Sequence, residues 1–524
     1  MFGRCQCVPD CSDRECGDDG CGGSCGDCPL GWVCADSEGV CHEPCIPDCR
    51  EGCCGEDGCG GLCAERCAAI GLICDTDSCG CTGGGPCALL PELVACDVLA
   101  PEPSTPEDVA AYYLDYAVPL YCDGEAFKQR DVTVFGLDAG DVQLFMFGEV
   151  HGSHELGRMS ADIFELLVRK GRVNTLTMEI GVDMSAPLDE FVRTGGGMLG
   201  DAGWLERLPR GMFIRTLVER ARLLTYAGYP LFVFGADIPM LPSSAVGVVE
   251  RLSDELSETR DHVLPLPAVS RWGGVDRNEA REWRDSVLDH RDAICDELGD
   301  SDDCEWFVQY TNAVWLSAVT SSGALQRLSP ALQYEFFSRR EEFIYFVYRT
   351  YLPDESFLIY SHMGAAHTAK VESERDGFAS AAARLDADYP VTAGRIYSTT
   401  PAYGPNSRIR YGGEIYDLPA EPWALSRALE SAPITEYQVS TWRPSSDCVK
   451  RPHLGLRSSQ DVLYSEAYDA FTWVRQLTPE SGGYMSEGGT FKSTSAFDPA
   501  PLILERRDAI AAARANLRRS LKAD

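Results

Sequence analysis

Short apolar runs alternate with longer amphipathic segments from about residue 109 to about residue 500. Brief apolar runs between turn residues are typical of buried strands, and apolar positions that recur every three or four residues are typical of helices. The predicted strands are 132–137, 142–147, 175–180, 231–234, 357–360 and 395–398, and the predicted helices are 155–170, 213–227, 280–298, 305–327 and 330–350. This alternation favours an α/β fold with a mostly parallel central sheet flanked by helices.

A long stretch without strands, about 245–350, interrupts the alternation and predicts a helical insertion in the α/β domain at 109–500. Cys295 and Cys304 flank a polar turn between two of its helices, so we expect a local disulfide there. After residue 500 the chain is rich in alanine and arginine, which predicts a C-terminal surface helix over 501–524.

The first 88 residues differ in composition from the rest, because 20 of the 25 cysteines lie between Cys5 and Cys87. Such a glycine- and aspartate-rich segment cannot bury an ordinary core, so disulfides or metal ions must hold it together. Disulfides are favoured, because the one CxxC pair, Cys25 and Cys28, lies within a dense series rather than in separated zinc-binding pairs. A small disulfide-rich N-terminal region is therefore expected.

This Cys-rich segment is an internal repeat, with two units at about 7–41 and 45–81. Its repeated string CGxDGCGGxC resembles the Cys-rich modules that precede many exported proteins of myxobacteria. The resemblance implies a stalk, spacer or adhesion module that contacts the cell surface or envelope. Residues 89–108, with the sequence PEPSTPED at their end, predict a linker to the α/β domain.

Disulfides imply an oxidising compartment, so we expect an extracellular or cell-envelope protein. The chain begins MFGRCQC without the apolar segment of a signal peptide, which predicts that the export signal is missing from this sequence. The net charge of −35, from 81 acidic and 46 basic residues, argues against nucleic acid and anionic membranes as partners, since both require basic patches. No apolar run is long enough for a transmembrane helix.

Titratable side chains follow four of the predicted strands at the point where each strand ends. In a parallel sheet these ends meet at one edge, which is where α/β proteins bind ligands. One such acid alone is most often a helix cap, but four of the eight histidines in the chain lie in two of these segments. The residues are Glu149, His151, His154 and Glu155 after the first strand, Glu179 after the second, Asp237 after the third, and His362 and His367 after the fourth.

The strings GEVHGSHE, MEIG, GAD, SRREEF and SHMGAAH occur in the order shown by the erythromycin esterase-like hydrolases, and they also resemble the related ChaN, Tiki and TraB proteins. The resemblance covers about 132–403 and rests on motif order, and DAFTWV at 469–474 is similar to a strand near the end of esterase-like members. It implies an α/β sheet with inserted helices. It also implies a histidine that acts as general base on a water attacking an ester or lactone.

The resemblance gives individual residues their expected roles. His151 matches the histidine of the first motif, Glu149 its partner carboxylate, Glu155 the acid that closes this motif, Glu179 the acid after the second strand, Arg340 the arginine of the helix before the last catalytic strand, and His367 the histidine of the GxxH loop. We therefore predict a catalytic set of Glu149, His151, Glu179, Arg340 and His367, and a binding set of His154, Glu155, Asp237 and His362.

Two departures from the esterase pattern limit this resemblance. One residue separates Glu149 from His151, as in ChaN and Tiki proteins, whereas esterase members usually have two. His362 and His367 lie five residues apart rather than three, and GAAH is similar to the TraB loop. The resemblance therefore implies a hydrolase acting on an unknown small-molecule or peptide substrate, and the macrolide esterase activity of named members is not carried over to this chain.

Residue chemistry leaves three interpretations open. In the first, which uses no cofactor, His151 takes a proton from water, Glu149 or Glu179 fixes its tautomer, and Arg340 or His367 stabilises the oxyanion. The sequence contains no GxSxG string, which favours water as the nucleophile. In the second, the domain is a metal-dependent hydrolase or protease of the Tiki type, in which Glu149, His151, Glu179 and His367 hold zinc or manganese. In the third, the domain binds a ligand such as haem, as in ChaN-like proteins, without catalysis.

Overall fold

The structure is a computed structural model, and the chain in it divides into two compact units. One unit comprises residues 1–85 and 122–126, and the other comprises the remaining residues. The structure describes residues 33–35, 40–42, 73–75, 80–82, 118–119, 142–196, 213–271, 273–299, 302–352, 358–372, 377–389, 396–403, 406–411, 414–418, 439–442, 468–474, 477 and 479. The predicted strand 132–137, linker 89–108 and C-terminal helix 501–524 lie outside these residues.

The described part of the Cys-rich unit consists of two short antiparallel hairpins. Strand β1 (Val33–Ala35) pairs with β2 (Val40–His42), and β3 (Ile73–Asp75) pairs with β4 (Gly80–Thr82). In the first hairpin Cys34 is opposite Cys41, and in the second Cys74 is opposite Cys81.

The second unit contains an eight-stranded sheet in the order β5-β13-β14-β10-β6-β9-β7-β8. All neighbours from β14 to β8 are parallel, whereas β13 runs antiparallel to both β14 and β5. The strands are β5 (Val118–Pro119), β6 (Leu144–Glu149), β7 (Thr175–Gly181), β8 (Phe232–Asp237), β9 (Ile359–Gly364), β10 (Ile396–Tyr403), β13 (Val439–Trp442) and β14 (Ala470–Val474). The fold is therefore α/β with a mostly parallel sheet, as the sequence predicts.

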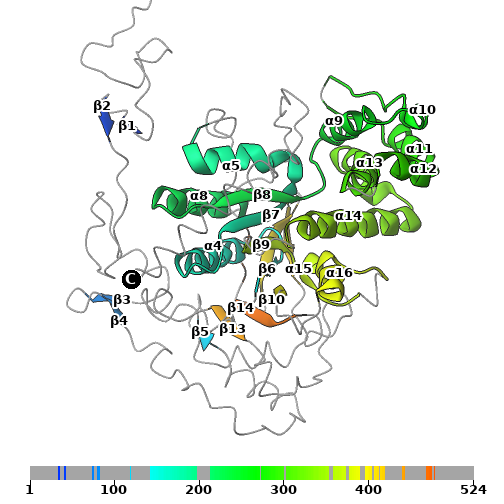
Figure 1. Cartoon of the computed structure of the whole chain (residues 1–524). Helices are drawn as coiled ribbons and strands as arrows, with labels where there is room; N and C mark the ends of the chain where they lie inside the picture. The colour runs from blue at the N-terminus through cyan, green and yellow to red at the C-terminus, as the bar shows by residue number, and fades with distance from the viewer. Residues whose placement is uncertain are drawn as a thin grey trace, which may run out of the picture. The chain divides into compact units, whose positions relative to one another are not determined.

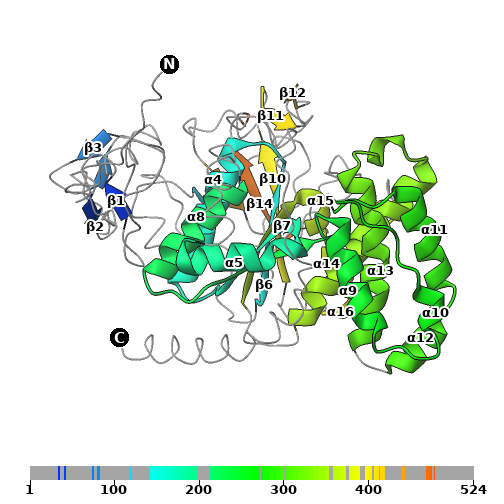
Figure 2. The same cartoon turned by 90° about the horizontal axis from the view of Figure 1, so that it is seen from above.

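Helices cover both faces of this sheet, which explains why its central strands are continuously apolar. Phe145 and Phe147 of β6 pack in one core, and the alternate residues Leu144 and Met146 pack in the other. Figures 1 and 2 show α4, α5 and α8 on one side and α9, α13 and α14 on the other. The helices are α4 (His154–Arg169), α5 (Ser185–Thr194), α8 (Phe213–Tyr226), α9 (Pro242–Ser253), α13 (Asp302–Ser321), α14 (Pro330–Tyr351) and α16 (Ala381–Asp388).

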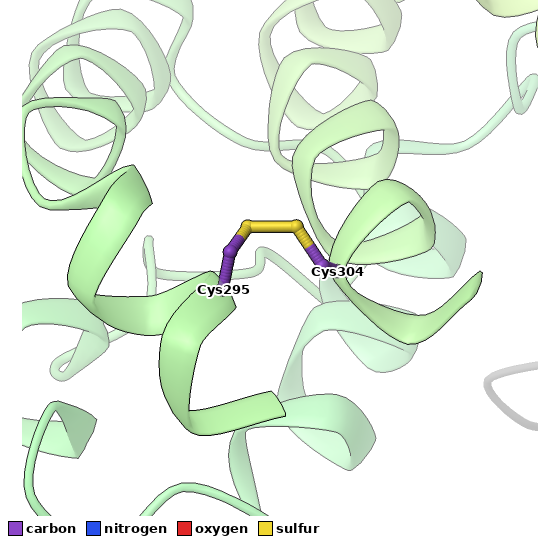
Figure 3. Close-up of a disulfide and its surroundings, with 2 residues drawn as sticks. All are labelled: Cys295 and Cys304. Atoms are coloured by element: carbon purple, nitrogen blue, oxygen red, sulfur yellow. A yellow bond between two sulfur atoms is a disulfide. The ribbon is translucent and has the colours of Figure 1, made fainter. Parts of the chain in front are cut away.

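The helices from α9 to α14 occupy the span in which the sequence predicts an insertion, and they include α10 (Arg260–Val263), α11 (Arg277–Leu288) and α12 (Arg291–Leu298). The prediction of a single helix over 280–298 was wrong, because α11 and α12 are separate. Val287 and Ile294 are both fully buried, so the helical spacing of apolar residues continues across the break between α11 and α12. The sequence pattern therefore does not show where one helix ends and the next begins. The predicted disulfide between Cys295 and Cys304 is confirmed, and it joins α12 to α13 (Figure 3).

Several smaller elements complete the described fold. They are the 3₁₀ turns η4 (Val182–Met184) and η5 (Leu325–Arg327), the short helix α15 (Ala365–Thr368), and the hairpin of β11 (Arg408–Tyr411) with β12 (Glu414–Asp417). Strand β9 extends four residues beyond the predicted strand 357–360, so His362 lies within the strand and not after it. None of the described helices is long and apolar enough to cross a lipid bilayer.

Candidate functional site

The carboxyl ends of β6, β7 and β9 border a cavity of about 490 Å³. Its polar end contains the five residues that the sequence predicts as catalytic. It also contains one further carboxylate, Glu341, that the sequence analysis did not predict. These lining residues are Glu149, His151, Glu179, Arg340, Glu341 and His367. The parallel sheet thus brings together side chains that are more than 200 residues apart in the chain.

His151 lies in the turn that joins β6 to α4. Its Nδ1–H donates to Oε1 of Glu149 at 2.7 Å, and its Nε2 lies 3.4 Å from Oε2 of Glu179. About a third of the His151 side chain (34%) is exposed, against 1% for Glu149. Gly152 follows with a φ of +81°, a left-handed conformation that glycine adopts without strain and that allows this tight turn.

The two members of this pair affect each other's titration. Burial raises the pKa of the Glu149 carboxyl, but hydrogen bonds and charge from His362 and His151 outweigh it and lower the pKa to about 2. Burial lowers the pKa of the His151 imidazole, but Glu179 and Glu149 outweigh it and raise the pKa well above its ordinary value. At neutral pH the geometry therefore favours an ionised Glu149 beside an imidazolium at His151.

His362 contacts the Glu149 carboxylate from a fully buried position. Its Nε2 lies 2.8 Å from Oε2 of Glu149, and its Nδ1 is 2.6 Å from the Oγ of Ser160 in α4. The imidazole has no exposed surface and stacks against the rings of Phe147 and Phe213, with centroids 5.4 and 4.4 Å away. His362 therefore positions Glu149 and does not line the cavity.

Glu179 is the central carboxylate of the site. Its Oε1 accepts hydrogen bonds from Nη2 of Arg340 at 2.6 Å and Nε2 of His367 at 3.2 Å, and its Oε2 accepts from the Gly364 amide at 2.7 Å. Burial raises its pKa, but the charges of His151, His367 and Arg340 lower it well below the ordinary range. A methyl group at Gly364 would lie 2.9 Å from Nε2 of His151, so glycine is needed for this close approach.

Arg340 reaches the site from α14. Its Nε donates to Oδ1 of Asp237 at 2.9 Å and its Nη2 to Oδ2 at 2.5 Å, in a bidentate pair at the end of β8. Burial lowers the pKa of Arg340, but Asp237 and Glu179 raise it well above its ordinary value, so the guanidinium stays charged. The hydroxyl of Tyr348, further along α14, is within hydrogen-bond distance of Thr177 and Ser361 and anchors the helix to β7 and β9.

His367 lies in α15 and pairs with a carboxylate that the sequence analysis missed. Its Nδ1 lies 2.5 Å from Oε1 of Glu341, while Oε2 of Glu341 accepts from the Ala381 amide at 2.7 Å. Burial lowers the pKa of His367, but Glu341 and Glu179 raise it to about 10. The only signal for Glu341 in the sequence is its position directly after Arg340 in SRREEF.

The residues predicted for binding lie outside the cavity wall. His154 and Glu155 begin α4 and are half-buried, while Asp237 and His362 are buried behind Arg340 and Glu149. The structure therefore separates two groups that the sequence alone placed together.

The alternative metal ligands Glu149, His151, Glu179 and His367 are directed at one another and not at a common point. Among the described residues, no group of three or more His, Cys, Asp or Glu side chains is arranged to hold a metal ion.

No family model matches the chain, and no curated protein matches it. Solved structures with a similar fold include a mutant of the erythromycin esterase EreC in its open conformation, with 14% identity, a TM-score of 0.48, and coverage of 68% of this chain and 96% of that one. A Bacillus cereus protein gives 14% identity and a TM-score of 0.47, and a succinoglycan biosynthesis protein gives 15% and 0.49. The last two matches each cover 72% of this chain and 99% of the other.

Proposed function

We propose that this protein is a hydrolase that cleaves an ester or lactone with water, using His151 as general base. The observation that carries the proposal is the geometry of His151: Glu149 fixes Nδ1 as the protonated nitrogen, and the ring remains a third exposed in the cavity. Once His151 has lost its extra proton, the other nitrogen, Nε2, is therefore the atom that can take a proton from a bound water.

The reaction balances with groups that the site contains. The oxygen of water attacks the carbonyl carbon while Nε2 of neutral His151 takes its proton, and a tetrahedral oxyanion forms. The positive charges of Arg340 and His367, which line the same cavity, stabilise that oxyanion. The carbon–oxygen bond then breaks, and the departing alkoxide takes the proton back from His151 to leave an acid and an alcohol.

The experiment measures hydrolysis of a panel of neutral esters and lactones by the wild-type chain and by His151→Ala, with and without EDTA. We expect hydrolysis by the wild type that EDTA leaves unchanged and that the substitution abolishes. Loss of activity with EDTA, restored by zinc or manganese, would support the metal-dependent interpretation. Equal activity of the two chains would exclude His151 as the base, and no activity from the wild type on any substrate would favour a ligand-binding protein.

We also propose that the protein acts outside the cytoplasm, with the Cys-rich unit in contact with the cell surface or envelope. The disulfide between Cys295 and Cys304 and the 20 cysteines of the first 88 residues support an oxidising compartment. Cell fractionation of the source organism, with thiol labelling of the isolated protein, tests this. A reduced protein in the cytoplasm would contradict it.

A further inference from the structure

The cavity has an apolar end that the proposed reaction does not use. Two phenylalanines, Phe337 of α14 and Phe378 just before α16, form it, and the cavity lining also includes Val371 and Ile409. The two rings are nearly parallel, with an interplanar angle of 8° and centroids 6.2 Å apart. Both side chains are only half-buried, so part of each ring is open to the cavity.

A second layer of aromatic side chains holds these two rings in place. Phe336, which is 2% exposed, packs edge-on against Phe337, and Tyr334 packs edge-on against Phe378. The hydroxyl of Tyr334 donates to the Gly377 carbonyl at 2.9 Å, next to Phe378. These contacts give each of the two rings a packing partner outside the cavity, and side chains that are already packed lose less entropy when a flat group binds.

The helix geometry places this apolar surface beside the reacting groups. Phe337 precedes Arg340 by three residues and Glu341 by four, so all three lie on one face of α14. A ligand that covers Phe337 and Phe378 would thus extend towards His151 in the same cavity.

Charge limits the ligand further. Each cation at the polar end, His151, His367 and Arg340, is already paired with a carboxylate. No lysine is among the described residues that line the cavity, and the chain carries a net charge of −35. An anionic ligand would meet paired cations and a repulsive field, so a neutral ligand is favoured.

From these contacts we propose that Phe337 and Phe378 determine specificity, by binding a flat, apolar group of a neutral substrate next to its ester or lactone bond. This inference rests on the proposed function, but its test does not. Binding of 1-naphthylacetamide, which is neutral and contains no ester, is measured by isothermal titration calorimetry. The anionic 1-naphthaleneacetate and the ring-free acetamide serve as comparisons.

We expect 1-naphthylacetamide to bind at least about tenfold more tightly than 1-naphthaleneacetate, and acetamide to show no saturation at the same concentrations. Phe337→Ala and Phe378→Ala should each weaken binding of the naphthyl amide about tenfold. Phe378→Leu keeps most of the side-chain volume and should lose less affinity for the naphthyl amide than the alanine variant. It provides the measurement if an alanine variant fails to fold. Tyr226→Ala, at a 53% exposed position at the end of α8, is the matched control and should bind as the wild type does.

Unchanged affinity in folded Phe337 and Phe378 variants, or tighter binding of the carboxylate, would overturn the inference. The two proposals fail separately. Binding as expected without any ester hydrolysis would contradict only the proposed hydrolase activity. Ester hydrolysis combined with an affinity for the naphthyl amide that neither phenylalanine substitution changes would contradict only the specificity assignment.

Discussion

Two histidine–glutamate pairs lie on either side of Glu179, and they differ mainly in exposure. In the first, His151 contacts Glu149 at 2.7 Å and its side chain is 34% exposed. In the second, His367 contacts Glu341 at 2.5 Å and its side chain is 5% exposed. The same pairing of residue types therefore occurs at one cavity, once with a partly exposed histidine and once with a histidine that is almost fully buried.

This difference separates a group that can change its charge from one that cannot. Both nitrogens of His367 contact carboxylates, and its pKa of about 10 keeps it cationic near neutral pH. His151 also has a raised pKa, but its exposed ring can meet water and substrate, which compete with Glu179 for Nε2. In the proposed reaction, this difference suits His151 to proton transfer and His367 to a fixed positive charge.

The largest expected effect comes from removing the exposed histidine. We expect His151→Ala to lower kcat/KM for a cleaved ester by about 10²- to 10⁴-fold, because the water loses its general base. Steady-state kinetics measures this. His262→Ala, on the short helix α10 away from the cavity, is the control and should leave kcat/KM unchanged. Wild-type kinetics in the His151 variant would mean that His151 is not the general base.

The next effect tests the buried pair. Glu341→Gln removes one of the two carboxylates that keep His367 protonated, and an adjacent opposite charge shifts a pKa by about 1 to 3 units. A fall of about two units would reduce the protonated fraction of His367, and hence kcat, about tenfold at pH 9. Activity in this variant should therefore decline with rising pH well before that of the wild type, whose fall we expect near pH 10.

The neighbouring residue provides a matched control for this substitution. Glu342→Gln removes a carboxylate that pairs with Arg339 and is 30% exposed, so the pH profile should keep its wild-type shape. Identical profiles for the Glu341 and Glu342 variants would mean that the charge of His367 does not matter for the reaction.

A smaller effect concerns the rising limb of the same profile. A base must be neutral, and Glu179 and Glu149 raise the pKa of His151, so kcat/KM should rise with pH through a value above 6.5. Glu179→Gln removes one of these charges and should move that limb down by about one unit. Glu219→Gln, at an exposed position on α8, should not move it. A rising limb at the same pH in all three proteins would count against His151 as the titrating group.

Much of this site could be predicted because it follows from strand ends. An apolar run that stops at Glu149 or before Glu179 marks the edge of a parallel sheet, and all such edges meet. The order of elements in the α/β domain followed in the same way from apolar spacing. The sequence could not show whether a histidine near a strand end lies inside the sheet, as His362 does, or beyond it, as His367 does.

Other parts depend on packing that no local pattern records. Glu341 lies in a run of four charged residues, RREE, and such a run usually marks a solvated helix face. Its burial follows from α16 packing against α14, and the Ala381 amide that it accepts from begins α16. Ser160 is likewise the one polar side chain among the buried residues of α4, and no local pattern reveals its contact with His362.

The smallest expected effect tests how far the pair of His151 and Glu149 depends on the buried side chains of His362 and Ser160. The Oγ of Ser160 is within hydrogen-bond distance of both Nδ1 of His362 and the hydroxyl of Tyr360, at 2.6 and 2.8 Å. Because a hydroxyl can donate or accept, Ser160 can satisfy Nδ1 whether or not that nitrogen carries a proton. On the other side of this imidazole, Nε2 lies 2.8 Å from Oε2 of Glu149.

Ser160→Ala should therefore destabilise the fold by about 1 to 3 kcal/mol, because it leaves Nδ1 of a fully buried imidazole without its partner. Urea unfolding measures this loss, with Ser322→Ala, at the end of α13, as a control of small expected effect. We expect kcat to fall only a few-fold, since Glu149 keeps its direct contact with His151. A loss of kcat as large as that of His151→Ala, in a variant that remains folded, would mean that proton transfer extends through His362. The groups that transfer protons would then include the buried His362, and not only His151 and Glu149.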